Sequence, residues 1–245
     1  MENRIGKDFI EMTKYAHLEP SPQSQGVPQP QLQIPAPADA KLIPLPDGKD
    51  LQLDNVNLIK LVESRETRRN YSETPLSMQE LSFLLWGTQG VKSVTEKPAT
   101  RRTVPSAGSR HAFETYLLIN RVAGLEPGLY RYMALEHQLA KLQAPADINS
   151  ILTIACKNQA HVRNSAVTFF WVAVPMRMVW RYCQRGYRYM FLDAGHVCQN
   201  LYLLAEAINC GVCAIAAYDD DLVNAALGVD GEEQFTIYIA TLGKR

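Results

Sequence analysis

Residues 166–175 (AVTFFWVAVP) form a near-continuous apolar run. Such a run predicts a central strand whose two faces are both covered. Other strand-like segments are residues 113–120 (FETYLLIN), 128–135 (GLYRYMAL), 137–142 (HQLAKL), 212–218 (VCAIAAY) and 235–243 (FTIYIATLG). Helix-like segments lie between them. This mixture predicts an α+β fold in which helices flank a mixed central sheet.

The helices have recognisable start and stop signals. Residues 56–65 (VNLIKLVESR) have a helical pattern, and Ser77 with Glu80 predicts a capping box that opens a second helix through Trp86. Asp147 is placed to cap a helix over residues 147–157, and a further helix should start among residues 219–221. Apolar residues recur at helical spacing from residue 194 to 208, and Gly211 is expected to cap that helix.

Composition favours one substantial core plus an appendage. The 245 residues are 47% hydrophobic, and the formal net charge is zero, so attraction to nucleic acid or an anionic membrane is not indicated. No apolar run approaches a membrane span, the N-terminus lacks a signal-peptide core, and the five cysteines suit a reducing cytoplasm. We therefore expect a cytoplasmic protein in which Cys210 and Cys213 are buried thiols. His161 and His196 lack a second ligand at metal-binding spacing, so no metal site is expected.

The N-terminal region has a different composition from the rest. Residues 19–48 hold eight of the fourteen prolines, and such a segment should run extended. It is either a flexible leader or an arm that wraps a partner subunit, because isolated apolar residues interrupt it. We place a proline-rich arm at residues 1–54 and the folded domain at residues 55–245.

Two polar segments could bind a ligand. Residues 64–71 (SRETRRNY) concentrate three arginines, whose guanidinium groups match phosphate oxygens, although a solvated basic turn would look the same. Residues 105–109 (PSAGS) are small enough for a flat ring to approach the backbone, although an ordinary turn before a strand also explains them.

The segment 180–211, WRYCQRGYRYMFLDAGHVCQNLYLLAEAINCG, carries a family resemblance. It resembles the late helix of the flavin-dependent nitroreductase superfamily, and within it the SagB-type dehydrogenase branch, whose segment approximates K-Y-x-x-R-x-Y-R-Y-x-x-x-E-x-G-H-x-x-Q-N-L. Four motifs in compatible order support this resemblance over residues 55–245. It implies a nitroreductase-like homodimer with two FMN sites at the subunit interface. The absence of a G-x-G-x-x-G fingerprint argues against a Rossmann domain instead.

The resemblance assigns FMN contacts residue by residue. Arg65 would bind the phosphate, the Thr67 hydroxyl would assist, and Arg69 would approach the pyrimidine edge of the flavin. The small-residue loop of the partner subunit would lie against FMN through Pro105, Ser106, Ala107, Gly108 and Ser109. The main chain at Ala216 and Ala217 would reach flavin N5. Gln159 would contact the flavin or its ribityl chain, although an exposed turn explains it equally well. Lys244 and Arg245 would replace the phosphate-binding cation of a C-terminal arm.

The resemblance also implies an activity. Family members pass electrons from NAD(P)H to an electron-poor acceptor such as a nitroaromatic or a quinone. The alternative is SagB-type oxidation of an azoline or related C–N bond in a modified peptide, but the expected Lys-Tyr pair is Arg181-Tyr182 here, and arginine cannot act as a base. Asp193 likewise stands where Glu is usual. Tyr182 could donate a proton or a hydrogen bond, or pack in the core. A non-catalytic binding subunit is the third hypothesis.

Overall fold

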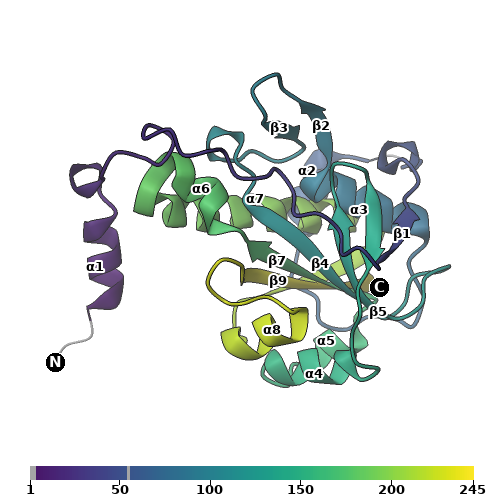
Figure 1. Cartoon of the computed structure of the whole chain (residues 1–245). Coiled ribbons are helices and arrows are strands. Elements are labelled where there is room, and N and C mark those ends of the chain that lie inside the picture. Colours follow the sequence, from purple (N-terminus) through teal and green to yellow (C-terminus); the bar gives the residue numbers. More distant parts are fainter. Residues whose placement is uncertain (1–3, 54–55) are drawn as a thin grey trace.

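A seven-stranded sheet forms the centre of the computed structural model, which describes residues 4–53 and 56–245 (Figure 1). The strand order is β1–β6–β5–β4–β7–β9–β8. The strands are β1 (Lys41–Pro44), β4 (Phe113–Ile119), β5 (Gly128–Met133), β6 (Gln138–Lys141), β7 (Val167–Ala173), β8 (Cys210–Ile215) and β9 (Phe235–Lys244); a separate hairpin joins β2 (Val91–Val94) to β3 (Thr100–Arg102).

The sheet is antiparallel rather than mixed. Every strand pairing in the described sheet is antiparallel, and two isolated parallel bridges join Thr67 to Val212, at the β8 edge, and Leu76 to Val122. The predicted mixed sheet is wrong because continuous apolar strands, which suggested it, are typical of parallel sheets. Here the apolar runs arise because helices cover both faces of an antiparallel sheet.

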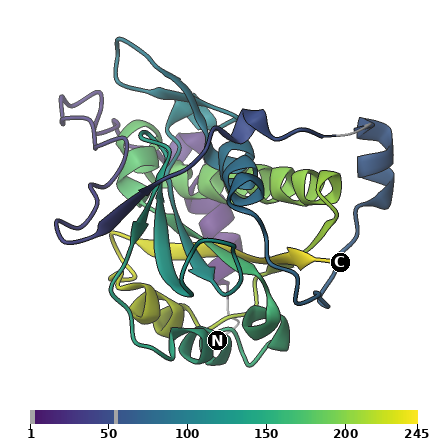
Figure 2. The same ribbon diagram turned by 90° about the vertical axis from the view of Figure 1, so that its right-hand side faces the viewer.

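The prediction of a covered central strand is confirmed. β7 lies between β4 and β9, and all its residues are buried. Phe169 and Trp171 point into one core with α3 and α7, whereas Phe170 and Val172 point into a second core with α4 and α8. The two helical layers lie on opposite sides of the sheet (Figures 1 and 2).

The described part of the chain has eight α-helices. They are α1 (Ile5–Met12), α2 (Leu58–Ser64), α3 (Met78–Gln89), α4 (Ile148–Ala155), α5 (Ala160–Asn164), α6 (Pro175–Tyr182), α7 (Gly186–Ala207) and α8 (Asp220–Leu227). Short 3₁₀ turns are η1 (Tyr15–His17), η2 (Gly48–Asp50), η3 (Ala107–Ser109) and η4 (Cys183–Arg185). None of the helices in the described part of the chain is long and apolar enough to span a membrane.

Some predicted helix ends are right and others are wrong. The Ser77–Glu80 capping box is present, and Asp219 caps α8 through its side chain. Asp147 precedes α4 but makes no side-chain cap bond. α7 ends at Ala207, and Gly211 lies inside β8, so Gly211 is not its cap. The left-handed turn falls at Asn209 instead (φ 55°), because β8 begins only three residues after the helix.

The described part of the N-terminal arm packs on its own protomer. The Trp180 indole N–H donates to the Val27 carbonyl at 2.8 Å, and the Ile34 N–H donates to the Glu114 carboxylate at 2.9 Å. The arm crosses α6 and ends as β1, which pairs with β6 (Figure 1). It is therefore anchored to the sheet of its own chain, and β1, placed within the predicted arm, is an edge strand of that sheet.

Candidate functional site

The arginine-rich segment runs along the outer edge of β8. The Arg68 N–H donates to the Val212 carbonyl at 2.9 Å, next to the parallel bridge at Thr67. Tyr202 of α7 links the segment to β8. Its hydroxyl lies 3.2 Å from Thr67 Oγ1 and accepts a hydrogen bond from the Ala214 N–H at 3.0 Å. The Arg65 guanidinium lies 5.4 Å above the Tyr202 ring. Thr67 and Arg65 are thus brought together around one phenol.

Arg69 reaches the next residue of β8 from the same segment. It hydrogen-bonds the Cys213 thiol, and its charge partly offsets the burial that raises the pKa of that thiol. Burial lowers the pKa of His161, and the Arg69 charge lowers it further. His161 Nε2 is buried without a partner among the described residues. Arg69 therefore lies beside two groups, Cys213 and His161, whose neutral forms are favoured.

The cations around β8 fall into two groups, those that pair with a carboxylate and those that do not. Arg68 pairs with Glu66, Lys244 pairs with Glu80, and Arg245 pairs with Glu206. In the described part of the chain, neither Arg65 nor Arg69 has a carboxylate partner. The two cations expected to hold phosphate and flavin are thus the ones left available, whereas Lys244 and Arg245 are already neutralised within the protomer.

The loop formed by residues 105–109 is held by α6 and α7. Gly108 has φ +56°, and a Cβ there would lie 2.5 Å from the Tyr182 hydroxyl and 3.3 Å from Arg181. Burial raises the pKa of Asp193, while hydrogen bonds from the Ser106 hydroxyl and the Ala107 N–H oppose that rise. Pro105 and Ser109 flank this contact, and Ser109 also has a positive φ of 54°. The Asp that replaces the usual Glu therefore anchors the loop.

Arg181 and Tyr182 close the same loop from α6. The Arg181 guanidinium lies 5.7 Å from the Tyr182 ring centroid, and Tyr182 packs edge-to-face against Tyr189 with 4.9 Å between centroids. Both predicted catalytic residues thus meet Gly108. The sequence left open whether Tyr182 packs in the core: its ring is partly buried and packs against the larger core cluster, and its hydroxyl lies where a side chain at Gly108 would go.

Gln159 and the residues after β8 meet each other. The Gln159 amide donates to the Ala217 carbonyl at 2.8 Å and to the Cys156 carbonyl at 2.9 Å. Ala216 and Ala217 are exposed at the end of β8. Gln159 therefore orients the backbone at Ala217, and its predicted contact with a flavin stays a prediction.

The loop 105–109 and the arginine-rich segment contact different parts of α7. Asp193 holds the loop and Tyr202 holds the segment, and nine residues of helix correspond to roughly 13 Å. Sequence analysis missed Tyr202 as the residue that organises the segment. The available signal was that Tyr202 is the one tyrosine in the apolar-periodic stretch from residue 194 to 208.

Comparison with known proteins identifies the family. The model of the nitroreductase family matches residues 62–244. The chain belongs to that family. A candidate nitroreductase of Methanocaldococcus jannaschii is 29% identical over 207 residues, which is 84% of this chain and 98% of the relative. The trifolitoxin-processing protein TfxB of Rhizobium leguminosarum bv. trifolii is 28% identical over 134 residues, or 53% of this chain and 36% of that protein.

Solved structures share the fold. A candidate nitroreductase from Anabaena variabilis has a TM-score of 0.62 at 28% identity and covers 76% of this chain, which spans only 38% of that one. The Escherichia coli microcin synthetase McbBCD complex, with truncated pro-MccB17 bound, has a TM-score of 0.62 at 18% identity, with 98% and 92% of the two chains covered. A candidate nitroreductase of Desulfovibrio desulfuricans in complex with FMN has a TM-score of 0.53 at 14% identity, covering 77% and 86%.

Proposed function

We propose that this protein is a homodimeric FMN-dependent oxidoreductase. It passes electrons from a reduced nicotinamide to an electron-poor acceptor such as a nitroaromatic or a quinone. The observation that carries the proposal is the selective pairing of cations around β8. Arg65 and Arg69 lack a carboxylate partner among the described residues, whereas Arg68, Lys244 and Arg245 each have one.

The residues present fit FMN. A guanidinium group offers parallel N–H donors that match two phosphate oxygens, so Arg65 with the Thr67 hydroxyl would hold the phosphate. Arg69 would lie at the pyrimidine edge, where a cation favours the negative charge of a reduced flavin. When bound, FMN supplies hydride transfer at N5. The exposed backbone at Ala216 and Ala217 would meet that edge of the ring.

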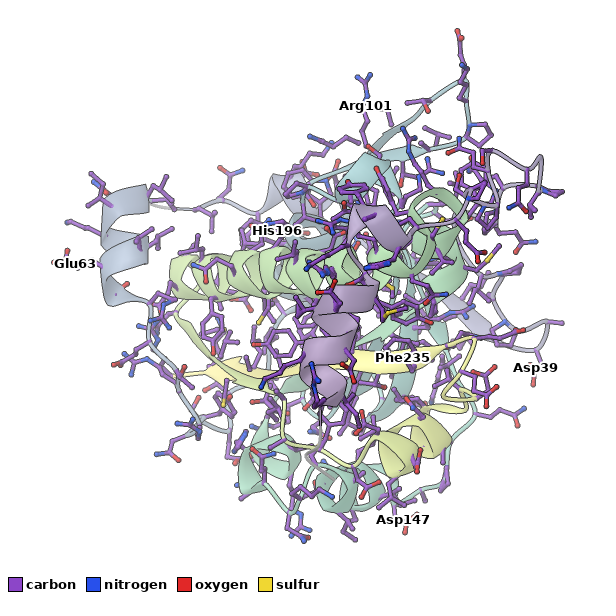
Figure 3. The ribbon with its side chains drawn as sticks, turned by 90° about the vertical axis from the view of Figure 1, so that its left-hand side faces the viewer. Asp39, Glu63, Arg101, Asp147, His196 and Phe235 are labelled. Carbon is purple, nitrogen blue, oxygen red and sulfur yellow. The ribbon has the colours of Figure 1, made fainter. Side chains whose placement is uncertain are left out.

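A second copy of the chain would bring its loop 105–109 next to the arginine-rich segment of the first. Exposed apolar side chains cover α2, where Ile59 is 77% exposed, and the outer face of α7, where Leu192 is 61% exposed. Figure 3 shows α2, with Glu63 near its end, standing away from the body beside α7, on which His196 lies. Large exposed apolar surfaces mark sites of protein association. We infer that the loop 105–109 of the partner subunit meets the arginine-rich segment across this face.

A second candidate is a SagB-type dehydrogenase that oxidises an azoline or related C–N bond in a modified peptide. The likeness to the trifolitoxin-processing protein and to the microcin synthetase complex favours it. Arg181 is evidence against this candidate, because a guanidinium stays protonated and cannot take up a proton as a neutral lysine does. The third candidate is a binding subunit that has lost catalysis. For all three candidates, the cytoplasmic location stays a prediction.

The first experiment tests the flavin site. We expect purified protein to bind FMN, and Arg65→Ala to bind it roughly 30-fold more weakly, because loss of a charged hydrogen-bonding pair costs about 2 kcal/mol. Arg163→Ala, which removes an exposed cation from α5, is the matched control. Fluorescence titration of the apoprotein with FMN measures both. Equal affinity in wild type and Arg65→Ala would contradict the phosphate assignment.

The second experiment separates the three candidates. Anaerobic mixing with NADPH and then NADH should bleach the flavin absorbance if a nicotinamide is the donor. Bleaching by an azoline-containing peptide, but by neither nicotinamide, would select the peptide dehydrogenase. Purified protein that neither contains nor rebinds FMN would select the non-catalytic subunit.

A further inference from the structure

Two guanidinium groups meet at Gly108 in the small-residue loop. Arg110 Nε donates to the Gly108 carbonyl at 3.0 Å. The Arg181 side chain, from α6, packs on the same residue, because a Cβ at Gly108 would lie 3.3 Å from its Cδ and from its Nε. Burial lowers the pKa of Arg110, and the Arg181 charge lowers it further. Two like charges are therefore held beside each other at one glycine.

Neither of these cations is neutralised within the described part of the chain. No carboxylate there forms an ion pair with Arg110 or Arg181, and the other charge that acts on Arg110 is that of the Tyr182 phenol. Asp193 holds the same loop, but the charge that acts on it is that of His196. Two neighbouring positive charges without a counterion repel each other, so the pair favours binding of an anion.

Aromatic rings hold both guanidinium groups in place. Arg110 lies 5.4 Å from the Trp180 ring centroid, and Arg181 lies 5.7 Å from the Tyr182 ring centroid. Trp180 is only 7% exposed, and its indole N–H donates to the Val27 carbonyl of the arm. Among the described residues, no hydrogen bond of an Arg110 Nη atom or of the Arg181 guanidinium is found. Donors that are already positioned bind a ligand with a smaller loss of side-chain freedom.

We propose that Arg110 and Arg181 bind the 2′-phosphate of NADPH and so select NADPH over NADH. The inference rests on the proposed oxidoreductase function. A phosphate monoester carries a charge of about −1.5 to −2 at pH 7, which matches two guanidinium groups better than a singly charged carboxylate does. This phosphate is the group by which the two nicotinamide donors differ. In the proposed dimer the loop lies against the FMN of the partner subunit, so the nicotinamide donor would bind beside the flavin.

The first test measures nucleotide binding by the FMN-loaded protein without turnover. Isothermal titration calorimetry compares adenosine 2′,5′-bisphosphate, which carries the 2′-phosphate, with adenosine 5′-monophosphate, which lacks it. The variants are Arg110→Met and Arg181→Met, and the matched control is Arg163→Met, which removes an exposed cation from α5. Arg181 is exposed, so Arg181→Met keeps the test valid even if Arg110→Met disturbs the loop.

We expect the wild type to bind the bisphosphate roughly 100-fold more tightly than the monophosphate, because each charged hydrogen-bonding partner contributes about tenfold. Arg110→Met and Arg181→Met should each bind the bisphosphate about tenfold more weakly and the monophosphate as tightly as the wild type does. Arg163→Met should match the wild type for both nucleotides.

The second test follows reduction of the bound flavin by each nicotinamide in anaerobic stopped-flow mixing. In Arg110→Met and Arg181→Met the apparent Kd for NADPH should rise about tenfold, while the limiting rate of flavin bleaching and the Kd for NADH stay unchanged. Arg181→Lys keeps the charge but loses the planar fork, so it should recover part of the NADPH affinity. A purely structural role in the loop would instead weaken both nicotinamides equally.

The outcomes separate this inference from the proposed function. A wild type that binds the two adenosine phosphates equally well would refute the 2′-phosphate site, and so would variants that weaken both nucleotides by the same factor. If NADPH and NADH reduce the flavin with equal apparent Kd, the inference fails and the oxidoreductase function stands. If neither nicotinamide bleaches a flavin-loaded wild type, the nicotinamide-dependent function and the inference fail together.

Discussion

Removing the Glu114 carboxylate should loosen the N-terminal arm and destabilise the fold. Glu114 on β4 and Arg177 on α6 are each only 3% exposed, and Arg177 Nη2 donates to Glu114 Oε1 at 2.5 Å. The same oxygen accepts from the Ile34 N–H at 2.9 Å, while Arg177 Nε donates to the Gln31 carbonyl at 2.8 Å. One buried ion pair thus holds two points of the arm.

The expected loss follows from what Glu114→Ala leaves behind. Arg177 becomes a buried cation without its carboxylate, which costs about 3–5 kcal/mol. Burial already lowers the pKa of the neighbouring Arg102 to about 10, and the Glu114 charge opposes that shift, so a second buried cation loses support. For a chain of this size, about 4 kcal/mol corresponds to a fall of about 8–16 °C in melting temperature.

Thermal unfolding and limited proteolysis measure this effect together. Glu114→Ala should melt earlier and expose the proline-rich residues of the arm to proteases under conditions in which the wild type stays intact. Glu126→Gln is the control, because Glu126 pairs with Lys141 at a side-chain exposure of 80% and such pairs contribute about 0–1 kcal/mol. A loss in Glu114→Ala no larger than in the control would refute the reasoning.

Two further substitutions probe the loop and its flank. Gly108→Ala should destabilise the protein more than Gly124→Ala in thermal unfolding: both have positive φ, costing about 1–2 kcal/mol, but only the Gly108 methyl would meet the Tyr182 hydroxyl, and equal losses would exclude that contact. Burial lowers the pKa of His111 from 6.5 to about 3, so the unfolded chain takes up a proton that the native protein refuses, and stability falls as pH drops below 6.5. His111→Asn, which tolerates the φ of 43°, should flatten the pH dependence of the unfolding free energy between pH 7 and 4; an unchanged slope would count against this assignment.

Local sequence signals predicted local structure well. The apolar run of β7 and the caps at Ser77 and Asp219 depend on neighbouring residues, and the structure confirms them. The wrong cap at Gly211 shows the limit, because the residue that turns the chain was decided by where β8 pairs with β9.

Long-range contacts could not be derived from the sequence. The 65–69 segment contains three similar arginines, and Glu66 could pair with any of them; that it pairs with Arg68 depends on how the backbone of the segment is held against Val212 of β8. The docking of the arm likewise depends on Ile34 meeting Glu114, eighty positions away. Both outcomes follow from tertiary packing.

The structure divides the candidate site into two mechanically different parts. Arg65 and Thr67 are supported by Tyr202 and β8, within the core of the fold. Tyr182 and Tyr189 are supported by α6, η4 and the arm, and the arm in turn depends on the Glu114–Arg177 pair. Loosening the arm should therefore disturb the packing around Tyr182 and Tyr189 before it disturbs FMN binding. A Glu114→Ala protein whose arm is cleaved by protease but whose FMN affinity equals that of the wild type would show that the two parts are separable, and the simultaneous loss of arm docking and FMN affinity would show that they are not.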